Sequence, residues 1–117
     1  MKVKQLSIFL ENRSGRLFDC LNVLKDNGIN VVSASLADTS DFGILRLLVS
    51  DTDKAVCVLR EHNIISKVTE VIAIVVPNAI GSLAKVLETI DKNNINISYL
   101  YGLSVTDDGA TIAIKTS

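Results

Sequence analysis

An internal repeat constrains the fold of this chain more than any other feature of its 117 residues. When Leu6 is aligned with Ile72, the segments Leu6–Asp51 and Ile72–Ser117 match to their ends without a gap. The identical pairs are Ile8/Ile74, Asn12/Asn78, Gly15/Gly81, Leu17/Leu83, Leu21/Leu87, Asn27/Asn93, Ile29/Ile95, Asn30/Asn96, Asp41/Asp107 and Gly43/Gly109. Self-similarity at a fixed period is typical of a repeated structural unit. We therefore predict two units, residues 1–69 and residues 70–117.

The hydrophobic pattern of the first unit changes between the periods of strands and helices. Alternating apolar residues predict a strand over residues 6–10. A helix follows, because Leu17, Cys20, Leu21 and Leu24 recur at helical spacing. Ser14 can cap the start of this helix, and Gly28 can end it. The same reasoning predicts strands at residues 29–37, 44–50 and 64–68, a turn at 38–43, and a second helix capped by Asp51 or Thr52.

The resulting order of elements is βαββαβ, which is the ferredoxin-like α+β arrangement. Its antiparallel sheet carries both helices on one face. The second unit repeats the strand at 71–76, the helix at 81–92, and strands at 95–105 and 110–116. It then stops, because Ser117 aligns with Asp51, where the second helix would start. We expect an incomplete second unit, either because the chain is truncated or because another chain completes the sheet.

Charge and hydropathy exclude several classes of partner. Twelve basic and 13 acidic residues give a net charge of −1, whereas nucleic-acid binding requires a basic surface. RNA binding on this frame also requires exposed aromatic residues, and the chain has two tyrosines and three phenylalanines. No apolar run is long enough for a membrane span, and the N-terminus lacks a signal-peptide pattern. Cys20 and Cys57 are expected to be buried, reduced thiols of a cytoplasmic protein.

The chain also lacks the residue patterns of enzymes and metal sites. His62 is its single histidine, and neither cysteine belongs to a cluster with metal-ligand spacing. No phosphate-binding loop or nucleophile–base set is present, and Asp107 and Asp108 precede Gly109 in what we predict to be a hairpin turn. We expect no catalytic residue, no metal and no cofactor.

Two segments carry a recognisable signature. Residues 10–17 read LENRSGRL and are followed by NGINV at 27–31, while residues 76–83 read VPNAIGSL and are followed by NNINI at 93–97. Both resemble the ACT domain family, in which a strand, a turn often reading Asn-x-Pro-Gly-x-Leu and a helix precede Gly-x-Asn-Ile. Ser14 and Ile80 stand where that family often has proline, and Asn94 replaces the glycine that ends the helix. The resemblance covers nearly the whole chain.

The resemblance implies a regulatory module that binds an amino acid or related small ligand where two such domains pair. The ligand would lie between the first strand–helix turn of one unit and the facing unit. On this sequence, that position corresponds to Asn12, Arg13, Ser14, Gly15, Arg16 and Asn30 in the first copy, and to Asn78, Ala79, Ile80, Gly81, Ser82 and Asn96 in the second.

Elementary chemistry is compatible with such a site. Glycine allows a ligand to approach the backbone, and the N–H groups at the start of a helix favour a carboxylate. Arg13 or Arg16 can also bind a carboxylate. Asn30 follows Asn12, and Asn96 follows Asn78, at the same spacing. This spacing corresponds to a turn plus one helix, and it can bring the two asparagines of each unit close together. The alternative is that the glycines and asparagines only shape the turns and strand starts.

Two hypotheses about function remain open at this point. The first is a stand-alone, non-catalytic regulatory protein that binds a small amino acid and acts through its pairing. The second is a ligand-free structural or regulatory subunit that dimerises or docks on a separate metabolic enzyme. Both include a homodimer in the cytoplasm, without nucleic acid or a membrane as partner.

Overall fold

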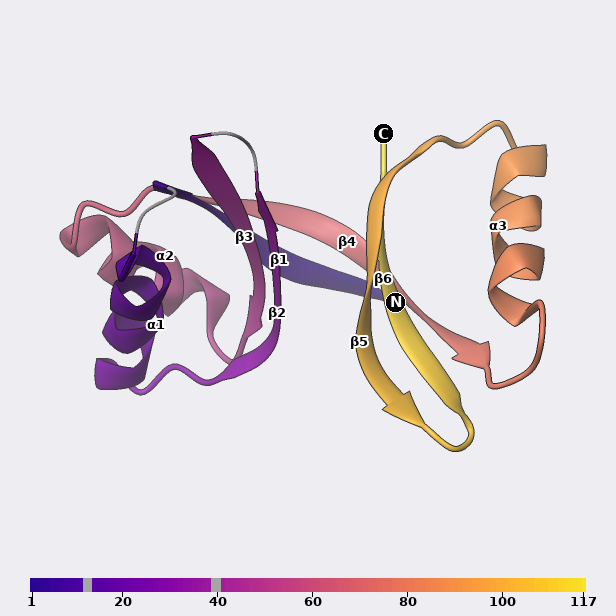
Figure 1. Ribbon diagram of the computed structural model, residues 1–117, viewed down its shortest axis with the longest axis horizontal. Helices are drawn as coiled ribbons and strands as arrows, with labels where there is room; N and C mark the ends of the chain where they lie inside the picture. Colours follow the sequence, from indigo (N-terminus) through magenta and orange to yellow (C-terminus); the bar gives the residue numbers. More distant parts are fainter. Residues whose placement is uncertain (12–13, 39–40) are drawn as a thin grey trace. The chain divides into compact units, whose positions relative to one another are not determined.

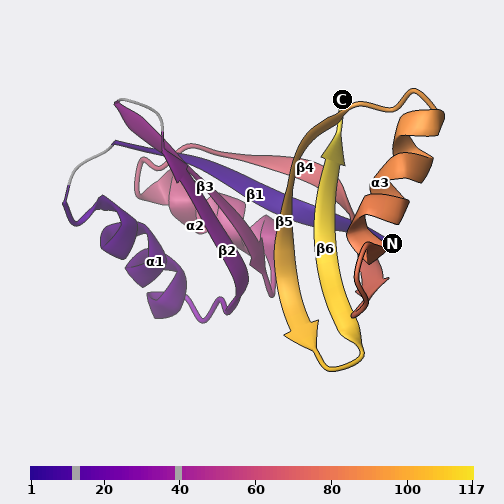
Figure 2. The ribbon, with the colours of Figure 1, turned by 45° about the vertical axis from the view of Figure 1, so that its right-hand side comes forward.

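The computed structural model describes residues 1–11, 14–38 and 41–117, and shows an α+β protein. Along the chain, these residues form β1 (Lys2–Glu11), α1 (Arg16–Asp26), β2 (Val31–Asp38), β3 (Phe42–Val49), α2 (Thr52–Glu61), β4 (Ser66–Pro77), α3 (Ser82–Lys92), β5 (Ile97–Thr106) and β6 (Gly109–Thr116) (Figure 1). The predicted fold class is confirmed. Two compact units result: a first unit of residues 4–69, and a second unit of residues 1–3 and 70–117 (Figure 2).

The first unit is a complete βαββαβ sandwich. Its strands follow the order β2-β3-β1-β4, with β3 antiparallel to both β1 and β2. Both helices lie on the same face of this sheet (Figure 1). The core between the helices and the sheet consists of Leu6, Ile8, Leu10, Cys20, Leu24, Ile29, Leu45, Leu47, Ala55, Val58, Leu59 and Ile64. Burial of these side chains is the main force that stabilises the unit.

Glycine determines where α1 and α3 begin. Gly15 and Gly81 are the N-caps, with left-handed φ angles of 88° and 80°, and neither helix has a side-chain cap. The prediction that Ser14 caps α1 is therefore wrong, because the left-handed residue places the cap one position later. The prediction for α2 is confirmed: the Asp51 side chain accepts a hydrogen bond from the Lys54 N–H at 3.1 Å.

The strands predicted at residues 64–68 and 71–76 are in fact one strand. β4 runs for 12 residues from Ser66 to Pro77, and its first residues belong to the first unit and the rest to the second. No glycine or proline lies between its two halves, so nothing in the local sequence ends the extended conformation. The predicted break at the boundary of the repeat is therefore wrong.

The second unit has its own β4, α3, β5 and β6, and lacks a counterpart of α2 among its described residues. Its strand order is β4-β6-β5, and the free side of β4 is covered by the start of β1. The Ala73 N–H donates to the Met1 carbonyl at 2.7 Å, and the Met1 amine donates to the Ala73 carbonyl at 3.2 Å. The start of the same chain therefore covers this edge of β4. Completion of the sheet by another chain was one of the two predicted alternatives for it.

The strand register corrects the alignment of β3 in the first unit with β6 in the second. Glu11 pairs with Phe42 in the first unit, and its equivalent Pro77 pairs with Gly109 in the second. The gapless alignment matches Phe42 with Asp108, whereas the register matches it with Gly109, so at this point the two copies are already offset by one further position. The identity of Gly43 and Gly109 in the gapless alignment does not reflect structural equivalence.

A β-bulge accommodates the additional residue. The register of β5 against β6 shifts between Gly102 and Ser104, so that Leu103 is the inserted position. The corresponding part of β2 pairs with β3 without a shift. A bulge inserts an extra residue in one strand while the flanking pairs keep their geometry. The two copies therefore resume the same pairing on both sides of Leu103.

The corrected register makes Ser117 the equivalent of Ser50, and not of Asp51. The Ser50 N–H donates to the Asn30 carbonyl at 2.9 Å, and the Ser117 N–H donates to the Asn96 carbonyl at 3.0 Å. The same backbone contact therefore occurs at the same place in both units.

The two thiols lie in different environments. The side chain of Cys20 on α1 is fully buried. This burial raises the pKa of its thiol to about 11, and the opposing effect of the Arg16 charge is smaller. Cys57 is exposed on α2, so the expectation that both thiols are buried is wrong for this residue: the buried face of α2 carries Ala55, Val58 and Leu59 instead. The folded state holds Cys20 as the neutral thiol. The stability that the buried neutral thiol contributes is therefore fully present below the ordinary pKa of 9.0, and it is lost as pH rises toward about 11.

This difference predicts that one thiol of the native chain reacts with a disulfide reagent at pH 8 and that the second reacts only after unfolding. The thiolate is the nucleophile, and the buried thiol forms it rarely. Absorbance of the released thiolate measures the stoichiometry with and without urea. In Cys57→Ser the rapid reaction should vanish; if it persists at full amplitude, Cys20 is accessible and the prediction is wrong.

Candidate functional site

The predicted site residues of the first unit surround the start of α1. Ser14 and Gly15 are exposed, and Arg16 is the first, half-buried residue of the helix. Asn12 and Arg13 lie outside the described residues. Among the described residues of this turn, a left-handed glycine thus lies next to Arg16, at the end of β1.

The second unit repeats this turn before α3. The Asn78 side chain donates to the Asp107 carbonyl at 3.4 Å, which links the turn to the β5–β6 hairpin. Ala79 and Ile80 are exposed, Gly81 is the N-cap, and Ser82 is the half-buried first residue of the helix. Residues 78–82 thus form the turn between β4 and α3.

Asn30 and Asn96 lie far from these turns. The Asn96 side chain donates to Ser117 at 2.9 Å, just beyond the end of β6, whereas Asn78 contacts Asp107, just before β6 begins. The whole of β6 separates the two ends, a length of roughly 25 Å. The expectation from their spacing is wrong, because the helix runs back along the strand and carries the chain to the opposite end of the unit.

A pocket opens beside Arg16 in the first unit. Its volume is about 310 Å³, and its lining consists of Phe9, Glu11, Arg16, Phe42, Asn63, Ile64 and Ile65. Register places Phe9, Glu11 and Phe42 on the same sheet face, since Phe9 pairs with Ile44 and Glu11 with Phe42. The side chains of Phe9 and Phe42 are 58% and 49% exposed. An apolar wall therefore adjoins one acidic and one basic side chain.

Arg16 is the residue of this pocket with unused hydrogen-bonding capacity. Its Nε atom is buried and has no hydrogen-bond partner among the described residues. A buried donor without a partner carries a desolvation cost, which a carboxylate placed against the guanidinium would offset. Two parallel N–H···O bonds are the preferred geometry of such a pair.

The second unit has a smaller pocket at the equivalent place. Its volume is about 170 Å³, and its lining includes Asn78, Ala79 and Ser82 of the predicted site. Pro77, Ser82 and Gly109 stand at the positions of Glu11, Arg16 and Phe42. The lining of this pocket carries no charged side chain. The two copies therefore share the place of the pocket and differ in its chemistry.

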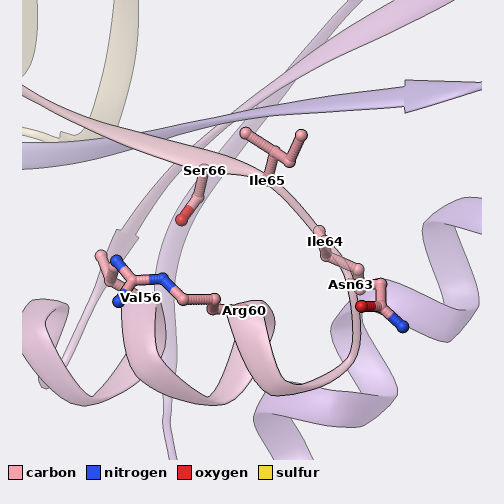
Figure 3. A pocket seen from close by; sticks show the side chains of 6 residues that line it. All are labelled: Val56, Arg60, Asn63, Ile64, Ile65 and Ser66. Atoms are coloured by element: carbon pink, nitrogen blue, oxygen red, sulfur yellow. The ribbon is translucent and has the colours of Figure 1, made fainter.

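A third pocket lies on the first unit between α2 and the start of β4 (Figure 3). It measures about 480 Å³ and is lined by Val56, Arg60, Asn63, Ile64, Ile65 and Ser66. Arg60 belongs to the last turn of α2, where the helix dipole is negative and disfavours a bound anion. The arginine there offsets the dipole of its own helix, so this pocket provides a control and not a candidate site.

Sequence reasoning identified Arg16 and missed the apolar wall of its pocket. Phe9 and Phe42 are distant in the sequence and meet only through the register of β1 and β3. The available signal was Phe9 itself, an aromatic residue on the side of the predicted strand opposite to Leu6, Ile8 and Leu10. Asn63, Ile64 and Ile65 follow α2 and carry no motif.

The described part of the chain contains no group of three histidine, cysteine, aspartate or glutamate residues that could hold a metal ion. Within the same residues, no helix has the length and hydropathy needed to cross a membrane.

Comparisons with known proteins bear on both units together. A family model described as the ACT domain pair matches residues 1–116. Protein BT0572 from Bacteroides thetaiotaomicron is 42% identical, with a TM-score of 0.92 over 100% of this chain and 81% of that chain. The regulatory subunit of aspartate kinase from Thermus thermophilus is 13% identical, with a TM-score of 0.65 over 95% of this chain and 81% of that chain. The regulatory subunit of aspartate kinase from Thermus flavus is 15% identical, with a TM-score of 0.67 over 95% of this chain and 80% of that chain. A search of curated proteins finds no match.

Proposed function

Because the chain belongs to the ACT domain pair family, whose fold is a regulatory module, we propose that it is a non-catalytic regulatory protein that binds a small amino acid or related carboxylate. The proposed site is the pocket at the β1–α1 turn of the first unit. The buried Nε atom of Arg16, which has no hydrogen-bond partner among the described residues, is the observation that carries this proposal.

The lining of the pocket favours an amino acid with an apolar side chain. The carboxylate would bind the Arg16 guanidinium, and the ammonium group would face the Glu11 carboxylate. Phe9, Phe42 and Ile65 would contact the side chain of the ligand. A volume of about 310 Å³ is at the lower end for ligand pockets, which fits a metabolite of this size.

The proposed mode of action is pairing between copies of the chain in the cytoplasm. An open pocket with exposed phenylalanines can be closed by a facing unit, as the family resemblance implies. Ligand binding would then change the stability of a homodimer, and so its action on a separate metabolic enzyme. The alternative is a subunit that dimerises or docks on such an enzyme without any ligand, in which case the phenylalanines serve only as contact surface.

We expect at least one apolar amino acid or keto acid to stabilise the protein against heat. A thermal-shift panel would contain the common amino acids and the aromatic and branched keto acids. At about 100 times Kd, binding adds roughly 2.7 kcal/mol to the free energy of unfolding. This raises Tm by roughly 10 °C for a chain of this length.

Arg16→Gln should abolish the shift, whereas Arg60→Gln should retain it. Both variants remove one arginine from the same unit, and only Arg16 lines the proposed pocket. A stable dimer that shows no shift with any compound would support the alternative. Equal loss in both variants would place binding elsewhere.

A further inference from the structure

The sequence contains a single asparagine that is followed by glycine, in the pair Asn27–Gly28. In such a pair the backbone nitrogen of glycine can attack the side-chain carbonyl carbon of asparagine, because glycine has no side chain that hinders the approach. Ammonia leaves and a five-membered succinimide ring forms. Water then opens this ring to aspartate or to isoaspartate, in which the main chain runs through the former side chain. Deamidation is therefore chemically easiest at Asn27.

The structure places this pair at the end of α1, in a Schellman motif. Asn27 is the C-cap, and Gly28 follows with a left-handed φ of 71°. The Gly28 N–H donates to the Lys25 carbonyl at 3.1 Å. The Ile29 N–H donates to the Leu24 carbonyl at 3.0 Å, and both of these residues belong to the buried core, as is usual beside such a helix end. Backbone hydrogen bonds and burial thus fix the end of α1.

Both reacting groups are engaged in this motif. The Asn27 side-chain nitrogen, which is the leaving group of the reaction, donates to the Val23 carbonyl at 2.8 Å. The Gly28 nitrogen, which is the nucleophile, holds its proton in the bond to Lys25. Attack requires this nitrogen to lose its proton and to turn toward the Asn27 side chain, so both hydrogen bonds must break first. The reaction therefore has to pass through local opening of the helix end.

We propose that Asn27 is a deamidation site that the end of α1 holds unreactive, and that its modification weakens this helix end. An aspartate at position 27 cannot donate to the Val23 carbonyl, and its charge lies at the negative end of the helix dipole. An isoaspartate inserts an additional carbon atom into the main chain before residue 28. This insertion displaces the N–H groups of Gly28 and Ile29 from their acceptors, so the burial of Ile29 is lost in part.

The second unit provides a natural comparison. Asn93 is the C-cap of α3, and its side chain donates to the Thr89 carbonyl at 2.8 Å. The next residue is Asn94, whose N–H donates to the Asp91 carbonyl at 2.9 Å and whose φ is also positive, at 56°. The same hydrogen bonds thus end both helices, but the side chain of Asn94 hinders attack by its own backbone nitrogen. Asn93 should therefore react far more slowly than Asn27, even in the unfolded chain.

Incubation of the full chain at mildly alkaline pH, with and without guanidinium chloride, tests the proposal. Liquid chromatography and mass spectrometry of its peptides distinguish asparagine, aspartate and isoaspartate at each position. Asp108 also precedes a glycine, but it has no ammonia to lose and keeps its mass. We expect Asn27 to react at least about tenfold more slowly in the folded chain, because only the open fraction is reactive. Equal rates in both conditions, or equal rates at Asn27 and Asn93 in the unfolded chain, would overturn the proposal.

Exchange of the following residue between the two units gives the matched variants. Gly28→Asn should abolish the reaction at Asn27, and Asn94→Gly should create one at Asn93. Each variant introduces a residue that the other unit already holds at positive φ, so both should fold. A reaction at Asn27 that continues at its full rate in Gly28→Asn would mean that attack by this nitrogen is not the route.

The effect on the helix end is measured on the deamidated chain, which ion exchange separates by its additional negative charge. Its Tm should be lower than that of the unmodified chain by roughly 4–8 °C. Asn27→Asp should lower Tm by less, because it adds the charge without lengthening the main chain. An unchanged Tm of the isoaspartate form would show that the end of α1 does not depend on this motif, and the proposal would be wrong.

Discussion

Replacing Leu24 by alanine is expected to lower the free energy of unfolding by about 2–5 kcal/mol. The Leu24 side chain is fully buried where α1 faces the sheet and α2. Its truncation removes apolar contacts on every side and leaves a cavity in a closed core, a loss that the surrounding elements cannot fully compensate. Urea titration followed by far-ultraviolet circular dichroism measures the effect.

The equivalent substitution in the second unit is the control. Ile90 stands at the same place on α3 but lines an open apolar groove between α3 and the sheet of the second unit, where water already reaches it. Ile90→Ala should therefore cost roughly 1 kcal/mol or less. A cost equal to that of Leu24→Ala would mean that the groove is filled in solution, because only a covered side chain leaves a cavity on truncation.

Gly109→Ala is expected to destabilise the second unit by about 1–3 kcal/mol. A Cβ atom at this position would lie 2.5 Å from the Val76 carbonyl oxygen, and both groups belong to the paired backbones of β4 and β6. Neither backbone can move without breaking the ladder between these strands. Tyr99 and Tyr101 on the neighbouring β5 provide a fluorescence signal for urea unfolding.

Gly102→Ala is the matched control on the same hairpin. A Cβ atom there meets no other atom within 4 Å, and Gly102 is not among the glycines with positive φ. The substitution should leave the free energy of unfolding unchanged or raise it by about 0.4–1 kcal/mol, because alanine restricts the unfolded chain. Equal losses in the two variants would rule out the contact with Val76 as the cause.

The order of elements could be predicted because their local patterns are strong. Residues 6–10 alternate as a strand whose alternate side chains are buried, and α1 and α3 each end before a residue of positive φ, Gly28 and Asn94. Asparagine tolerates this conformation better than most other residues, so its replacement of glycine preserves the helix end. Period and turn chemistry together were sufficient for the fold class.

The errors arose where pairing between distant residues decides the structure. Nothing local indicates that Met1 pairs with Ala73, or that Leu103 is inserted as a bulge. The wall of the proposed site has the same origin, because Phe9 and Phe42 meet through register alone. Arg16 was identified since it belongs to the turn motif itself.

The pairing of Met1 with Ala73 also has a consequence for how the chain folds. These residues are 72 positions apart, yet residues 1–3 belong to the same compact unit as residues 70–117. On the ribosome, the start of the chain emerges first and must wait for β4 before it finds this partner. The first unit, residues 4–69, also needs the start of β4, so both units depend on the synthesis of this strand. Neither sheet can therefore close before β4 has been made, although both contain residues from the start of β1.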